Sequence, residues 1–336
     1  MTGNLFISMD FGLNTPEQPG TDDGTQRPWT SDKPVWYSNN SIRLDPGVDI
    51  ATVDQPTHIK VRVSNKGAQV MKSVIVEAWF FIPGIGDMKP PGAFHTFVSG
   101  LADVPAGGST VFICDTDPVW VPSDTDLAKT NGGHACIIAN CYQSDEFVPD
   151  PEGSSVDINQ SVAPNGDQHQ GQRNIQIIKV QKAVASVPQR FSYTTYPPTD
   201  FSHHEYLVSA THVNPRIERF DPTTEAVLVS QEGVEAFETG VNGGSGLNLI
   251  TSGGPVEIRP ATDPPTFELR TEGLPRELGA RFRFEEGRAD QIDSEMVVQL
   301  PPDAEVGSLH SFDLGMWADN GELVGSGMHV LVLVTE

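Results

Sequence analysis

Positive charge is scarce in this sequence. Twenty-one Lys and Arg residues stand against 45 Asp and Glu residues, so the formal net charge is −24, and no lysine follows Lys182. Nucleic acids and anionic membrane surfaces are bound through basic patches, so the charge argues against both as partners. A strongly acidic surface suits solubility, high salt or divalent cations, and the charge alone does not choose among them.

Long apolar runs are missing as well. No run approaches the roughly 18 apolar residues of a membrane span. The first 20 residues lack both the basic region and the apolar region of a signal peptide. We therefore expect a chain without a membrane span, made in the cytoplasm and compatible with an exported or particle-borne assembly, although the sequence does not indicate the final compartment.

Cysteine is limited to three residues, Cys114, Cys136 and Cys141. The number is odd and no CxxC pair occurs. Two interpretations remain open, namely buried free thiols or one disulfide with a spare thiol. His134 lies close to Cys136, but a single strand cannot close a tetrahedral metal site around these ligand types.

Turn residues, by contrast, are abundant, with 32 Gly and 27 Pro. Between the turns lie short segments of alternating polarity. In residues 58–64 the apolar Ile59, Val61 and Val63 alternate with polar residues, which predicts a strand with one buried face. No segment before residue 182 has a helical period. The pattern predicts an all-β chain.

The alternating segments form two groups and predict two tandem immunoglobulin-like β-sandwich domains. Residues 1–30 are predicted to be an extended N-terminal arm, with a short strand at Leu5–Ile7, of the kind that packs on a neighbour. The first sandwich is expected over 31–182 and the second over 206–336. Residues 183–205, with two adjacent prolines, are predicted to be a linker.

Three stretches of the first group resemble the CARDB-type module, a bacterial cell-adhesion-related domain. They are "HIKVRVSNKG", "VPAGGSTVF" and "DQHQGQRNIQI", and "WTSDKPVWYSNN" is similar to the leader that often precedes such modules. The resemblance covers about residues 30–180 and implies an immunoglobulin-like sandwich. The ending that includes "PPDAEVGSLHSFDLGMWADNGEL" is similar to the last hairpin of bacterial immunoglobulin or fibronectin-like modules.

Acidic loops are the strongest candidates for a metal site. Calcium takes six to eight oxygen ligands, often from such loops. The densest loop carries Asp115, Asp117, Asp124 and Asp126, and two others lie at 45–54 and 145–152. None has the spacing of a helix-loop-helix calcium site, so solvated turns are the alternative interpretation.

A second cluster of ligand types consists of His203, His204, Glu205 and His212. A zinc hydrolase of the His-Glu-x-x-His type would need a histidine where Val208 stands. Surface histidines beside a domain boundary are the alternative. Trp120, in the long insertion after residue 115, is the candidate for an exposed aromatic platform that stacks on sugars, whereas Trp79 and Trp317 are expected in the core.

No catalytic motif is complete, so the predicted function is non-enzymatic. We expect a structural or adhesion subunit whose arm and edge strands contact protein partners, or further copies of the chain, in a surface appendage or phage-like particle. A carbohydrate or surface-ligand module and a metal-dependent hydrolase are the alternatives. No cofactor is expected, with calcium as the one candidate.

Overall fold

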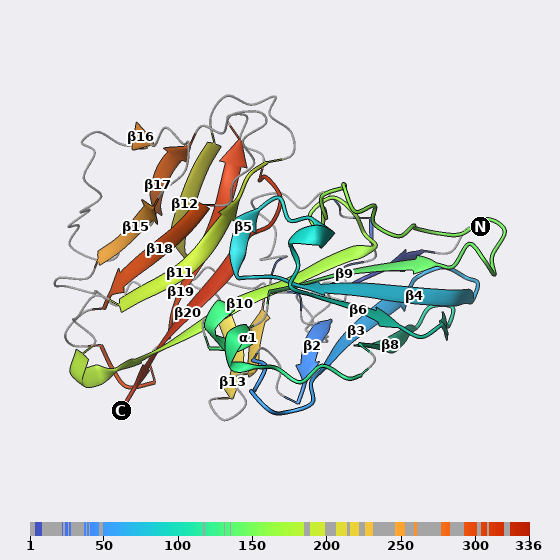
Figure 1. Ribbon diagram of the computed structural model, residues 1–336, viewed down its shortest axis with the longest axis horizontal. Helices are drawn as coiled ribbons and strands as arrows, with labels where there is room; N and C mark the ends of the chain where they lie inside the picture. Colours follow the sequence, from blue (N-terminus) through green and yellow to red (C-terminus); the bar gives the residue numbers. More distant parts are fainter. Residues whose placement is uncertain are drawn as a thin grey trace. The chain divides into compact units, whose positions relative to one another are not determined.

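The structure is a computed structural model (Figure 1). It describes residues 4–8, parts of 22–46, and 50–198 apart from 117, 131, 135 and 185–188. After residue 205 it describes the strands named below, Leu300, residues 304–307 and residues 323–336. Strands dominate the described residues, which confirms the prediction of an all-β fold.

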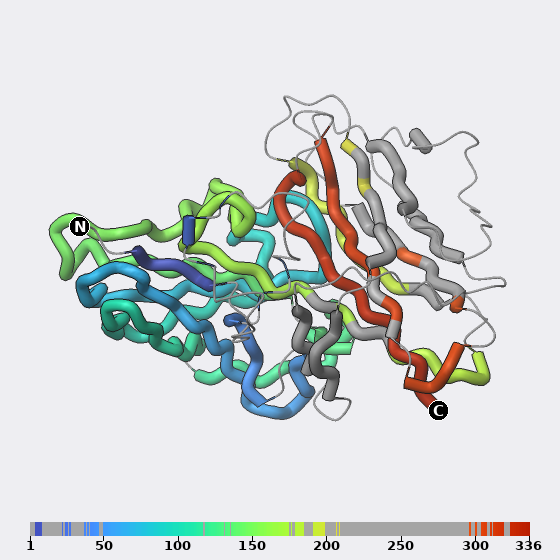
Figure 2. The backbone as a smooth tube through the Cα atoms, turned by 180° about the vertical axis from the view of Figure 1, so that it is seen from behind, coloured from blue at the N-terminus to red at the C-terminus, as the bar shows by residue number. Residues whose placement is uncertain are grey.

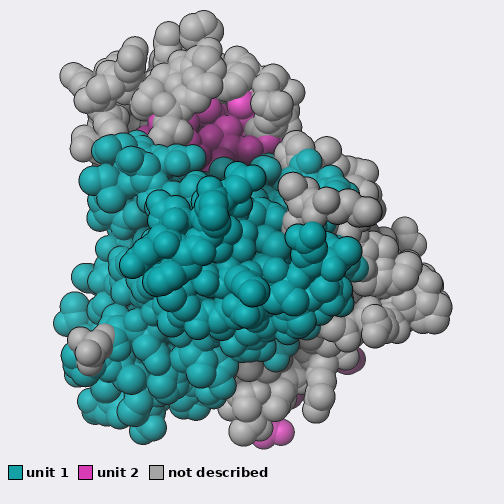
Figure 3. All heavy atoms as spheres, turned by 90° about the vertical axis from the view of Figure 1, so that its right-hand side faces the viewer, with its two compact units in different colours: residues 1–82, 88–174, 217–231 teal, residues 83–87, 175–216, 232–336 magenta. Residues whose placement is uncertain are grey.

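Residue contacts divide the chain into two compact units (Figure 3). Each unit is built from segments that are not contiguous in sequence. Unit 1 comprises residues 1–82, 88–174 and 217–231, and unit 2 comprises residues 83–87, 175–216 and 232–336. The sequence predicts successive sandwiches over 31–182 and 206–336 with a linker at 183–205, whereas the contact division exchanges short segments between the two units.

Unit 1 has the strand order of an immunoglobulin-like sandwich. Along its sheet the order is β1-β3-β8-β6-β4-β9-β10, and β2 pairs with β3 and β7 with β4. In immunoglobulin lettering β2, β3, β8 and β6 correspond to strands A, B, E and D, and β4, β9 and β10 to C, F and G. The strands are β1 (Leu5–Phe6), β2 (Ile42–Asp45), β3 (His58–Asn65), β4 (Met71–Phe80), β6 (His95–Ser99), β7 (Ala102–Val104), β8 (Ser109–Asp115), β9 (Cys136–Gln143) and the start of β10 (Gln170–Gln181).

Alternation along β3 works as the sequence predicts. Ile59, Val61 and Val63 are fully buried, and the residues between them are only partly buried. They join a core with Val74, Val76, Ala78 and Phe80 of β4 and with apolar residues of β8 and β9. Burial of this one face fixes the register of β3, because a shift by one residue would expose every apolar side chain.

The N-terminal segment is part of this core. β1 runs antiparallel to β3, with Leu5 opposite Asn65, and lies beside it in Figure 2. Leu5 and Ile7 are fully buried. The Ile7 N–H donates to the carbonyl of Gln168 at 3.0 Å, and the Gln168 amide donates to the carbonyl of Leu5 at 3.0 Å. The short strand is confirmed at Leu5–Phe6. Residues 4–8 pack on their own chain, and most of the arm predicted over 1–30 lies outside the described residues.

Unit 2 is a two-sheet sandwich. One sheet has the order β5-β11-β18-β15, and the other consists of the second part of β10 followed by β20-β19-β12-β17-β16. The strands are β5 (Gly84–Gly86), β11 (Gln189–Tyr196), β12 (Tyr206–Val213), β15 (Gly246–Ser252), β16 (Arg259–Pro260), β17 (Glu277–Phe282), β18 (Ile292–Gln299), β19 (Leu309–Ala318) and β20 (Met328–Thr335). Strands β13 (Arg216–Asp221) and β14 (Ala226–Ser230) form a separate two-stranded sheet, and the contact division places residues 217–231 in unit 1 rather than unit 2. The core of unit 2 includes Phe191, Tyr206, Phe312 and Val330.

Two features of unit 2 were not predicted from the sequence. Residues 189–196, predicted to be part of the linker, form β11, because Phe191 and Tyr193 alternate with polar residues and are buried. The three-residue β5 pairs parallel to β11. A Cβ atom on Gly84 would lie 2.4 Å from the carbonyl oxygen of Thr194, so this close pairing requires a glycine.

One short α-helix, α1 (Asp124–Lys129), lies in the insertion after β8, where no helix was expected. Two 3-10 turns, η1 (Pro90–Gly92) and η2 (Lys182–Val184), complete the helical elements of the described residues. The Asp126 N–H donates to the Ser123 hydroxyl, and the Ser123 N–H donates to the Asp126 carboxylate at 2.8 Å. This Ser-x-x-Asp capping box explains why the helix begins at residue 124.

Candidate interaction surface

Histidine–carboxylate pairs are the most prominent polar contacts among the described residues. The pairs are His58–Asp115 at 2.7 Å, His95–Asp126 at 2.9 Å, His169–Asp167 at 2.9 Å and His329–Asp313 at 2.6 Å. Each could in principle belong to a catalytic site, because a histidine oriented by a carboxylate is a general base. Their surroundings therefore decide what they do.

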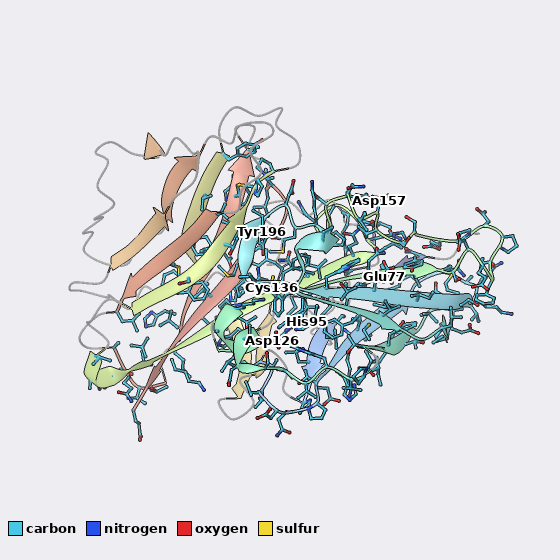
Figure 4. The ribbon with its side chains drawn as sticks, in the orientation of Figure 1. Glu77, His95, Asp126, Cys136, Asp157 and Tyr196 are labelled. Carbon is cyan, nitrogen blue, oxygen red and sulfur yellow. The ribbon has the colours of Figure 1, made fainter. Side chains whose placement is uncertain are left out.

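The His95–Asp126 pair joins α1 in the insertion to β6 (Figure 4). Burial acts to raise the pKa of Asp126, but hydrogen bonds from the Ser123 backbone and from His95 outweigh it and lower that pKa. A nucleophilic triad would require the serine on the histidine ring. Ser123 instead donates its hydroxyl to Asp126 at 2.9 Å, so this trio caps a helix.

Trp120 lies in the core of unit 1, where its side chain packs against aromatic rings. Its centroid is 5.0 Å from those of Phe80 and His95 and 5.6 Å from that of Phe97. Only 6% of the residue is exposed. The Thr57 N–H donates to its carbonyl at 2.8 Å. The structure corrects the expectation that Trp120 is exposed, because the insertion folds back onto the sheet; Trp79 is buried as expected.

The predicted metal ligands do not converge in the described residues. Asp115 pairs with His58, Asp124 lies in the first turn of α1, and Asp126 caps that helix. Asp117 lies outside the described residues. In the described part of the chain, no group of three or more His, Cys, Asp or Glu residues is arranged to hold a metal ion. Calcium binding at this loop stays a prediction.

The second predicted cluster falls largely outside the structure's description. His203, His204 and Glu205 are not described, and His212 lies on β12. The hydrolase hypothesis that rests on them stays a prediction.

The three cysteines are buried free thiols, which confirms one of the two interpretations left open by the sequence. Burial raises the pKa values of Cys114 and Cys141. Both thiols are therefore held in the unreactive protonated form.

His169 forms a partly buried ionic cluster beside the N-terminal strand. Its ring lies 2.9 Å from Asp167 and 3.7 Å from Glu152, whose carboxylate also accepts the Leu5 N–H at 2.6 Å. Burial alone would lower the pKa of His169, but the hydrogen bonds and charges of Asp167 and Glu152 outweigh it and raise the pKa to about 9. The imidazolium therefore links the loop before β10 to β1.

This cluster predicts a loss of stability at alkaline pH. Because the folded pKa of His169 is higher than the unfolded value of 6.5, its contribution is complete below about pH 6.5 and disappears as pH rises through about 9. The loss should be roughly 3 kcal/mol at most. Urea unfolding at pH 6 and pH 9.5 would measure it, with His169→Gln as the control that flattens the dependence. An equal loss in wild type and variant would contradict the assignment.

One solvent-facing surface of unit 1 combines aliphatic and basic side chains. On β3, Lys60 and Arg62 stand opposite Ile113 and Val111 of β8, and Arg43 of β2 stands opposite Lys60 on the other side. Val111 is 57% exposed and Ile113 48%. We call this surface the basic–aliphatic face and define it as Arg43, Lys60, Arg62, Val98, Val111 and Ile113.

The composition of this face is unfavourable for an isolated domain. The outer face of an antiparallel sheet is normally polar, and like charges directly opposite each other, as Arg43 and Lys60 are, destabilise strand pairing. An ion pair between Lys60 and Asp45 and a hydrogen bond of 3.2 Å from Arg62 to the Ser41 hydroxyl offset part of that cost. A partner that covers the aliphatic side chains and brings carboxylates close to the cations would offset more of that cost.

No family model matches this chain. No curated protein matches its sequence. Among solved structures it is similar to the CupB6 tip adhesin from Pseudomonas aeruginosa, at 10% identity over 88% of this chain and 98% of that one, with a TM-score of 0.21. The collagen adhesin of S. aureus gives 7% identity, coverages of 89% and 94%, and a TM-score of 0.26.

A third similar structure is a point mutant of CfaE, the CFA/I adhesin of enterotoxigenic E. coli. It gives 10% identity over 90% of this chain and 85% of that one, with a TM-score of 0.22. All three are adhesins, but TM-scores at this level carry no argument about function.

The resemblance to CARDB-type modules stays a prediction. No helix in the described residues is long and apolar enough to cross a membrane.

The basic–aliphatic face is not evident from the sequence. Residues 109–115 are apolar at Val111 and Ile113 on one side and at Phe112 and Cys114 on the other, a pattern typical of a strand buried on both faces. Only the strand order shows that the side of Val111 and Ile113 is open. A usable signal was present in the basic residues at every second position of β3, since Lys60 and Arg62 must share a face.

Proposed function

We propose that this protein is a non-enzymatic β-sandwich subunit that binds acidic polypeptide surfaces through the basic–aliphatic face, as a structural or adhesion component of a larger assembly. The observation that carries the proposal is the exposure of Val111 and Ile113 beside Lys60 and Arg62. In a chain with a net charge of −24, cations gathered on an apolar surface are an exception that a partner would explain.

The chemistry of the face defines the partner. Burial of exposed aliphatic area supplies non-directional affinity of about 25 cal/mol per Å². The cations orient an acidic partner on the face and exclude basic partners, because charge complementarity across an interface governs specificity more than affinity. The aliphatic stems of Lys60 and Arg62 also contribute contact area. A partner segment with alternating acidic and aliphatic side chains satisfies both requirements.

A synthetic peptide of alternating glutamate and valine, labelled with fluorescein, tests this function with the full-length protein. Fluorescence polarisation should show saturable binding that weakens at least tenfold in the variant K60E/R62E, which is about 1.4 kcal/mol or more. The variant K89E/K182E makes the same change in net charge at two exposed lysines outside the face and should bind like wild type.

The aliphatic contribution is tested separately with V111S/I113S, which keeps every charge. This variant should also lose at least tenfold in affinity for the same peptide, because both side chains are predicted to be covered on binding. Equal binding by wild type, K60E/R62E and V111S/I113S would show that the peptide binds elsewhere and would reject the face as a binding surface. Absence of any binding by wild type would reject the function itself.

A further inference from the structure

A second exposed feature of unit 1 has the opposite chemistry. Residues 145–150, between β9 and β10, read "DEFVPD", and we call them the acidic–aromatic loop. Phe147 is 55% exposed, and Asp145, Glu146 and Asp150 are exposed around it. A large aromatic side chain surrounded by carboxylates and left in water is unusual for a surface loop, because such exposure carries a solvation cost.

The loop is held in a fixed conformation. The N–H groups of Phe147 and Val148 donate to the Ser144 carbonyl at 3.2 and 3.1 Å, and the Ser144 N–H donates to the carbonyl of Ser73 at 2.9 Å. At its base the Gln143 N–H donates to the carbonyl of Glu152 at 2.9 Å. Because the backbone is ordered before any partner arrives, binding through Phe147 would cost little conformational entropy.

We propose that the acidic–aromatic loop of one molecule docks onto the basic–aliphatic face of a second copy of this chain. The two features match in kind. The loop carries three carboxylates, and the face carries Arg43, Arg62 and Lys60, of which Lys60 also pairs with Asp45 of its own chain. The aromatic ring of the loop matches the exposed aliphatic row of Val98, Val111 and Ile113. This inference rests on the proposed function, since it requires the face to bind polypeptide, and it adds the identity of the occupant.

The contact joins two different patches, so the association is heterologous. Phe147 is 55% exposed, so it is not covered by the face of its own molecule. Each copy therefore offers one exposed loop and one exposed face, and the copies associate head to tail into a ring or a growing chain. Long-range repulsion between two acidic molecules opposes association at low salt. At 0.15 M salt, where the Debye length is about 8 Å, that repulsion is largely screened and the contact pairs persist.

Sedimentation velocity on the full-length protein at about 0.15 M salt, over a concentration series, tests the proposal. Wild type should form dimers or larger species as concentration rises. The variants F147S and K60E/R62E should each sediment as monomers. An equimolar mixture of the two should form dimers and nothing larger, because one molecule supplies the only intact loop and the other the only intact face.

Matched controls change similar side chains outside the contact. Ile158 is 66% exposed in the same connection between β9 and β10, so I158S should associate like wild type, as should K89E/K182E. Failure of the mixture to form dimers, or association by F147S alone, would overturn the proposal. If wild type stays monomeric while still binding the glutamate–valine peptide, this inference is wrong and the proposed function stands. If both results are negative, both are wrong.

Discussion

Replacing Leu5 and Ile7 with alanine is expected to lower the free energy of unfolding of unit 1 by roughly 4–8 kcal/mol. Both side chains are fully buried in its core. Each truncation removes apolar contact and leaves a cavity that the surrounding strands fill only in part. A loss of this size is comparable to the whole stability of a typical domain. At the upper end, unit 1 should no longer fold at 37 °C.

Urea unfolding followed by tryptophan fluorescence measures the effect. The control is Leu101→Ala, at a leucine that is 48% exposed, and it should change the unfolding free energy by less than about 0.5 kcal/mol. An unfolding midpoint of L5A/I7A equal to that of wild type would show that the N-terminal segment does not pack on β3. Packing of this segment on β3 also matters for assembly experiments. A chain without residues 4–8 would expose the edge of β3, and it would aggregate through that edge without any specific association.

The second large effect is expected at Trp120, where alanine should cost roughly 3–5 kcal/mol. The ring fills the space between Phe80, His95 and Phe97, and its loss would free the insertion that it anchors. Trp120→Phe should cost much less. The buried indole N–H has no hydrogen-bond partner among the described residues, and phenylalanine removes that unsatisfied donor.

Differential scanning calorimetry of the two variants separates this structural role from the sugar-platform role predicted from the sequence. A structural role requires a large fall in the melting temperature of W120A and a small one for W120F. A sugar platform would instead leave W120A as stable as wild type and abolish binding in a glycan screen. The ring contacts favour the first outcome.

Local patterns in the sequence were sufficient to predict much of unit 1. Alternation in β3 predicts its buried face, because burial on one side of a strand leaves a period of two in the sequence. The Ser-x-x-Asp motif of Ser123 and Asp126 indicates the start of a helix, although a helix of six residues is too short to show helical periodicity. The burial of Trp120 was not predictable, because it depends on how the insertion folds back onto strands distant in sequence.

The domain boundaries depend on similarly distant contacts. β5 has three residues, of which two are glycine, so nothing in its own sequence indicates that it joins β11. The two features of the proposed interface also differ in how far the sequence predicts them. The acidic residues of the loop at 145–150 were noted as a candidate ligand loop, while the exposed face was hidden in a strand that is apolar on both sides. Charge is visible in a sequence, but exposure is decided by the fold.

The long-range pairing of β10 has a consequence for synthesis of this protein on the ribosome. Gln181 pairs with Thr335, roughly 150 residues later in the chain. At translation rates of about 5–20 residues per second, the second part of β10 waits roughly 8–30 s for its partner β20. Its sequence, "IQIIKV", is an apolar strand edge, so during that interval the nascent chain is open to mispairing with its neighbours on the same messenger RNA. Slow translation or loss of chaperones should therefore reduce the yield of folded protein, while the stability of the molecules that do fold stays the same.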